Sequence, residues 1–193
     1  MPPVPVRRRL LQGLGLLLLL GALGASPPLR AEPVELAQLD LARSDGALTL
    51  EFAARVTLPR AVEEALHRGV PVYFVAQADL KRKRWYWRDE RVARVTRSWR
   101  VAYQPLTNTW RVSLGGLHQS YPSLADAMAT VSRSGGWRIA ELAQLDADSR
   151  YELEFIYKLD TAQLPSFMQI GLGGPNEWAI GAERVLRLDA DKP

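Results

Sequence analysis

The sequence predicts a mainly β fold: an antiparallel β-sandwich with immunoglobulin-like layers and two short helices in its connections. Two observations support this fold class. Apolar and polar residues alternate in about eight short runs, as in half-buried strands. Turn residues such as Ser44-Asp45-Gly46 and Thr107-Asn108 separate these runs. Strand–helix–strand units long enough for a parallel sheet are missing, which argues against a doubly wound α/β fold.

The first predicted elements are a β-hairpin and a short helix. Residues 34–42 and 47–56 alternate on either side of Ser44-Asp45-Gly46, so they pair as antiparallel strands. Pro59 suits the first position of a helix, and Gly69 suits its end. The apolar side of this helix, predicted over Pro59–His67, consists of Val62, Ala65 and Leu66.

Three strands are predicted next. Residues 70–80 are rich in Val, Tyr and Phe, which favour strands. Residues 91–103 alternate, and we expect one face to carry Ala93, Val95, Trp99, Val101 and Tyr103. A strand over 109–114 follows, and Gly115-Gly116 ends it, which leaves residues 115–121 as a predicted loop.

A second helix and three strands complete the predicted fold. Ser123 and Asp126 have the spacing of a capping box, which begins a helix over Leu124–Arg133. Gly135-Gly136 is expected to stop this helix. The predicted strands that follow span residues 137–142, 151–159 and 178–188.

The first 31 residues have the order of a secretory signal peptide. Arg7-Arg8-Arg9 precedes an uncharged, leucine-rich run of 14 residues, Leu10–Leu23, and Ala31 supplies a small residue before the predicted cleavage. Domain boundaries follow: a signal peptide over 1–31 and a single β-rich domain over 32–193 that begins at Glu32. The apolar run is shorter than the roughly 20 residues of a membrane-spanning helix. Twin-arginine export and an uncleaved leader that anchors the domain to the inner membrane are the alternatives.

Composition narrows the function classes. The chain has 25 Lys+Arg and 21 Asp+Glu, and four of the basic residues lie in the leader, so residues 32–193 carry 21 of each and no net charge. This balance argues against nucleic-acid binding, which needs a basic domain. Because the chain has no cysteine, disulfides, thiol nucleophiles, zinc–thiolate sites and lipid attachment to cysteine are excluded.

Catalytic motifs are scarce, so we predict no catalytic residue, no metal site and no cofactor. The two histidines, His67 and His118, lack metal-ligand spacing. The glycine-rich run Gly171–Pro175 opens no helix after a strand, and a Gly-x-Ser-x-Gly motif is missing. The leading hypothesis is therefore a non-enzymatic binding or scaffold domain. The rival is an enzyme that acts on an envelope polymer through carboxylates such as Asp146, Asp148, Glu152 and Glu154.

Residues 81–100 combine cations with aromatic side chains. Nine basic residues occur there against two acidic ones. This composition predicts a docking surface for an anionic envelope partner, such as lipid head groups, a glycan or an acidic protein face. The candidate binding residues are Arg84, Trp85, Tyr86, Trp87, Arg88 and Arg91. The alternative is a cross-strand ladder in which arginine stems cover the tryptophans of an outer sheet face.

Several motifs resemble those of one family of exported proteins. They are Arg84-Trp85-Tyr86-Trp87-Arg88-Asp89-Glu90, Tyr103-Gln104-Pro105-Leu106-Thr107, Leu164-Pro165 with Met168-Gln169-Ile170, and Trp178. Between about Val34 and Leu188 the chain resembles exported Gram-negative proteins that have a proline-rich signal peptide and a domain of unknown function. The resemblance implies an envelope location and no assigned catalytic residues. It also implies the extracytoplasmic region of a membrane sensor kinase as a candidate partner.

The leader generates the first testable prediction. Because signal peptidase cleaves after small residues, the protein isolated from its host is expected to begin at Glu32 and to lie in the periplasm. N-terminal sequencing of the fractionated protein measures this. A terminus at Met1 or Pro2 in the membrane fraction contradicts cleavage and supports the anchored alternative.

Overall fold

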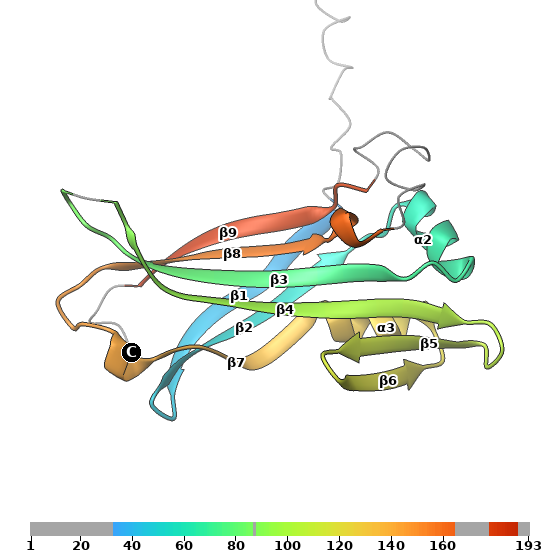
Figure 1. The fold of residues 1–193 in the computed structure, drawn as a ribbon, viewed down its shortest axis with the longest axis horizontal. Coiled ribbons are helices and arrows are strands. Elements are labelled where there is room, and N and C mark those ends of the chain that lie inside the picture. The colour runs from blue at the N-terminus through green and yellow to red at the C-terminus, as the bar shows by residue number, and fades with distance from the viewer. Residues whose placement is uncertain (1–32, 87, 165–177, 189–193) are drawn as a thin grey trace, which may run out of the picture. The chain divides into compact units, whose positions relative to one another are not determined.

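Two antiparallel sheets build the fold, described here from a computed structural model that covers residues 33–86, 88–164 and 178–188. One sheet has three strands in the order β1-β2-β7, and the other has six in the order β6-β5-β4-β3-β8-β9. Their bounds are β1 Val34–Ser44, β2 Ala47–Val56, β3 Val72–Arg82, β4 Glu90–Gln104, β5 Thr109–Leu114, β6 Leu117–Tyr121, β7 Arg133–Glu141, β8 Tyr151–Leu159 and β9 Gly181–Leu188. Figure 1 shows the smaller sheet running obliquely behind β8, β3 and β4. The predicted mainly β, sandwich-like fold class is confirmed.

Both predicted helices form where their start signals lie. Helix α2, Arg60–His67, follows Pro59 and buries Val62, Ala65 and Leu66, and Gly69 turns the chain at φ 83°. Helix α3, Leu124–Val131, begins after Ser123, whose hydroxyl oxygen accepts a hydrogen bond from the Asp126 backbone N–H at 3.1 Å. Two short 3₁₀ turns, η3 Leu142–Gln144 and η4 Thr161–Gln163, flank β8.

Two local predictions were wrong. Residues 117–121 are a strand, not a loop, because Gly115-Gly116 turns the chain back and β6 pairs with β5. The side chains of residues 117–120 are exposed whichever face they lie on, and only Tyr121 is half-buried, so the sequence has no alternation to reveal the strand. Gly135-Gly136 does not stop a helix: α3 has already ended at Val131, and both glycines lie inside β7. They coincide with a shift in the β2–β7 register, where Gly136 adopts φ 57°.

Two strands begin or continue differently from their predicted pattern. In β1, a register shift between Leu36 and Gln38 inserts Ala37 as an extra residue. The buried positions therefore change phase, from Val34 and Leu36 to Leu39. The last strand begins at Gly181, and the buried Trp178 precedes it outside the sheet.

Several sequence predictions concern residues outside the described part of the chain. These are the signal peptide over 1–31, its cleavage between Ala31 and Glu32, the glycine-rich run Gly171–Pro175 and the candidate site residue Trp87.

The two sheets meet in an aromatic cluster around Phe52 of β2. Its ring centroid lies 5.0 Å from that of Phe155, 5.6 Å from that of Tyr157 and 6.2 Å from that of Trp99, all on the six-stranded sheet. The hydroxyl of Tyr157 donates to the Val131 carbonyl oxygen at 3.2 Å, and burial raises the pKa of Tyr157. The cluster therefore fixes the inner face of the large sheet and leaves the opposite face open.

Removal of the Phe52 ring tests this description of the core. Phe52→Ala leaves a cavity between the sheets and is expected to lower the free energy of unfolding by about 3–5 kcal/mol, measured by urea denaturation. Leu106→Ala is the control, because Leu106 is fully exposed and its removal is expected to change stability by less than about 0.5 kcal/mol. Equal effects of the two substitutions would contradict the central position of Phe52.

Candidate docking site at the tip of the β3–β4 hairpin

The β3–β4 hairpin collects the basic–aromatic residues identified in the sequence. Its strands pair from Val72 opposite Val101 to Arg82 opposite Glu90, so residues 83–89 form the connection, here called the tip. Figure 1 shows this tip projecting at one end of the six-stranded sheet. The structure places the predicted residues Arg84, Trp85, Tyr86 and Arg88 in the tip, while Arg91 lies on β4.

The aromatic side chains of the tip lie outside the core. Trp85 is 93 % exposed and Tyr86 is 69 % exposed, whereas Trp99 on β4 is buried. The rings of Trp85 and Tyr86 contact each other edge to face, with centroids 4.9 Å apart. Arginine stems do not cover Trp85. The alternative of a cross-strand ladder, in which arginines shield the tryptophans, therefore does not hold for this ring.

Most cations of the basic segment pair with carboxylates. Among its nine basic residues, all within the described chain, six form ion pairs with six carboxylates. The pairs are Lys81–Glu154, Arg82–Glu90, Arg82–Asp146, Lys83–Asp89, Lys83–Glu152, Arg84–Glu90, Arg91–Asp79 and Arg94–Asp79. The local positive charge inferred from the segment alone is therefore largely neutralised by neighbouring strands.

Asp79 is the most buried member of this network. Its side chain is 3 % exposed, and it accepts hydrogen bonds at 3.0 Å from the Nε groups of both Arg91 and Arg94. Residues three apart point to opposite faces of a regular strand. A shift in register opposite Leu80 and Lys81 adds a residue to β4 and brings both arginines to the same face.

Asp89 closes the tip. Its carboxylate accepts a hydrogen bond from Lys83 Nζ at 2.8 Å and one from the Arg84 backbone N–H at 3.4 Å. The hydrogen bond with Lys83 lowers the pKa of Asp89 and raises the pKa of Lys83. The Lys83 backbone N–H donates to the Arg150 carbonyl oxygen at 2.9 Å, which ties the base of the tip to the chain before β8. These contacts hold the backbone from which the aromatic rings project.

Arg97 does not belong to this surface. It lies opposite Ala76 on the inner face of the large sheet and reaches across to β7. There it donates to the Ser134 hydroxyl, and its guanidinium lies 5.0 Å from the centroid of the Trp137 ring. Burial lowers the pKa of Arg97. This cation therefore joins the two sheets.

Three of the four carboxylates considered for acid–base chemistry, all except Asp148, pair with cations within the described chain. Asp146, Glu152 and Glu154 each pair with a cation of the basic segment. The sequence showed two separate features, a basic run and a set of acidic residues. The structure brings them together across β3 and β8, which are neighbours in the sheet but about 70 residues apart in the chain.

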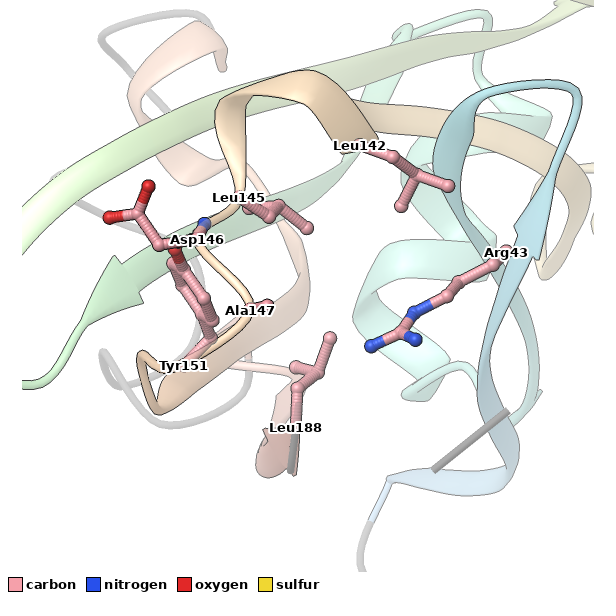
Figure 2. A pocket seen from close by; sticks show the side chains of 7 residues that line it. All are labelled: Arg43, Leu142, Leu145, Asp146, Ala147, Tyr151 and Leu188. Atoms are coloured by element: carbon pink, nitrogen blue, oxygen red, sulfur yellow. Dashed lines mark hydrogen bonds between the residues drawn. The ribbon is translucent and has the colours of Figure 1, made fainter. Parts of the chain in front are cut away.

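A small cavity lies at the edge of the two sheets. Its volume is about 180 Å³, and its lining residues are Arg43, Leu142, Leu145, Asp146, Ala147, Tyr151 and Leu188. Figure 2 shows Arg43 and Tyr151 on opposite sides and the Asp146 carboxylate pointing away from the other lining side chains. Ligand pockets usually measure about 300–1,000 Å³, so this cavity is small for one. No local sequence pattern indicates this cavity, because its residues come from three distant segments, around residue 43, over 142–151 and at residue 188.

The histidines have packing positions or lie on the surface. His67 contacts Trp110 edge to face at 5.1 Å and Tyr103 at 6.0 Å between centroids, while His118 is exposed on β6. In the residues that the structure describes, no group of three His, Asp or Glu side chains could hold a metal ion. No helix in this part of the chain has the length and hydropathy needed to cross a bilayer.

The chain was compared with models of known protein families. Residues 31–187 match the family described as a domain of unknown function, DUF4390. The chain belongs to this family. The DUF4390 match covers β1 to β8 and almost all of β9, so it includes both sheets and the tip. Comparison with curated proteins and with solved structures gave no match.

The ion-pair network predicts unequal effects of charge reversal within one segment. Arg91→Glu places a carboxylate beside buried Asp79 and is expected to lower the free energy of unfolding by about 1–3 kcal/mol. Arg88→Glu, in the exposed tip, is expected to change it by less than about 0.5 kcal/mol. Urea denaturation of both variants measures the difference. Similar losses for the two would contradict a stabilising role of the Arg91–Asp79 pair.

Proposed function

We propose that this DUF4390 protein is an exported, non-enzymatic binding domain of the cell envelope that docks through the tip of the β3–β4 hairpin. The observation that carries the proposal is the exposure of Trp85 and Tyr86 on a backbone held by ion pairs. Both rings face solvent at the end of the hairpin instead of joining the core, so they contribute little to folding.

The physical cost of this arrangement favours a binding role. Burying a large aromatic side chain gives about 1.5–3 kcal/mol, which a folded protein forgoes when the ring remains in water. Trp, Tyr and Arg are also the residue types that dominate binding hot spots. Asp89 fixes the tip before any partner arrives, so less conformational entropy is lost on binding.

Export rests on the leader and on the resemblance to exported Gram-negative proteins with a proline-rich signal peptide. The order of arginines, leucines and Ala31 supports passage to the periplasm. The absence of cysteine is compatible with a periplasmic domain that needs no disulfide. In this proposal the extracytoplasmic region of a membrane sensor kinase and an anionic envelope surface are the candidate partners, with no role for nucleic acid.

The engaged carboxylates support a binding role over the enzymatic rival. An acid–base pair needs carboxyl groups that can exchange protons with a substrate. Asp146, Glu152 and Glu154 are instead each paired with a cation of the hairpin. The proposal therefore needs no cofactor, metal or catalytic residue.

Site-specific cross-linking in the native host tests the docking role. Replacement of Tyr86 by p-benzoylphenylalanine is expected to give light-dependent adducts with an envelope component, since this side chain is exposed at the tip. The same replacement at Leu106 is the control, because that residue is also exposed but lies in the turn beyond the other end of β4. Adducts from Leu106 alone, or none from Tyr86, would refute docking through the tip.

A further inference from the structure

We infer that the tip docks on a phospholipid bilayer that contains anionic lipid, with the aromatic rings in the membrane interface and an adjacent basic groove around the lipid phosphates. The inference rests on the proposed docking function of the tip and names its partner. Two observations carry it: the exposed rings and the groove, which the sequence did not reveal.

The basic groove lies beside the base of the tip. It has a volume of about 510 Å³ and is lined by Lys83, Arg150, Tyr151, Glu152, Arg187 and Leu188. Three of these residues are cations and one is an anion, so the lining carries a net charge of +2. Arg150 and Arg187 are exposed, and no ion pair of either occurs among the described residues. The groove therefore offers the guanidinium groups of two arginines to an anion. Arginine binds phosphate groups through two parallel hydrogen bonds, so a phosphate suits this groove.

The tip and the groove share one residue, Lys83. Lys83 lines the groove and begins the tip, and its backbone N–H binds the Arg150 carbonyl oxygen at 2.9 Å. Trp85 follows two residues later, within about 7 Å along an extended chain. At a bilayer surface, Trp and Tyr rings occupy the head-group level and cations interact with anionic lipid. The short separation lets both parts act on the same membrane.

The shape and size of the tip favour a bilayer over a folded protein. A stable protein interface buries about 800 Å² on each partner. Two aromatic side chains supply about 150–250 Å² each, or about 300–500 Å² together, which is less than two thirds of that area. A fluid lipid interface accepts a projecting tip without a matching concave surface. The rings of Trp85 and Tyr86 can therefore insert into the lipid interface.

Binding to lipid vesicles tests the inference. The protein is purified from its native host, so it carries whatever processing the cell gives its N-terminus. Vesicles of phosphatidylcholine, with or without phosphatidylglycerol, are sedimented with the protein. Trp85→Ala with Tyr86→Ala is expected to weaken partition into both vesicle types by at least about tenfold. Arg150→Gln with Arg187→Gln is expected to remove much of the preference for phosphatidylglycerol, by about fivefold for each cation. Leu106→Ala is expected to bind like the wild type.

A second measurement locates the ring. Brominated lipid quenches tryptophan fluorescence at the interface, and the difference between wild type and Trp85→Phe isolates the contribution of Trp85. Quenching of that contribution supports the inference. Vesicle binding that is unchanged in the double-ring variant, or binding without a preference for phosphatidylglycerol, overturns it. Adducts from position 86 with protein alone also overturn the lipid partner while leaving tip docking intact, whereas no adducts at all refute both.

Discussion

Contact between the two sheets is the constraint on which the rest of the structure depends. A six-stranded antiparallel sheet is stable only if one face is removed from water, and β2 achieves this by placing Phe52 against Phe155, Tyr157 and Trp99. Helix α2 contacts β4, and helix α3 contacts β5, β6 and β7. With no disulfide available, this apolar contact must provide most of the stability. It also orients the hairpin that carries the tip.

The opposite face of the large sheet is organised by charge. The network around Asp79 joins β3 to β4, and Lys81 and Lys83 extend it to β8. Partly exposed ion pairs contribute little individually, but a network that shares a buried carboxylate holds several side chains at once. The network therefore separates residues that stabilise the fold from residues that are accessible to a partner. Six of the nine cations in residues 81–100 are paired with carboxylates in the fold, and the aromatic rings and the groove remain accessible.

The sequence predicts the parts of this fold that depend on local periodicity. The alternation of Tyr151, Leu153, Phe155 and Tyr157 identifies β8, and Ser123 marks the start of α3, because both signals lie within a few residues. Bulges at Ala37 and at Gly135-Gly136 could not be predicted, since each is set by the register with a partner strand. The tip residues were identified, but their surroundings were not. Pairing of Lys81 with Glu154, and the groove between Lys83 and Arg187, require β3, β8 and β9 to be neighbours, which no local pattern encodes.

Strand β6 has a consequence for how the protein behaves at high concentration. It is an outer strand of the six-stranded sheet, so one row of its backbone N–H and C=O groups faces away from β5. Such rows recruit strands of other chains and start aggregation when they are long and apolar. Here the strand has five residues, and His118, Gln119 and Ser120 at its centre are polar. A copy that pairs along β6 would gain few backbone bonds and little apolar contact, so the brevity and polarity of this strand act as a safeguard for solubility.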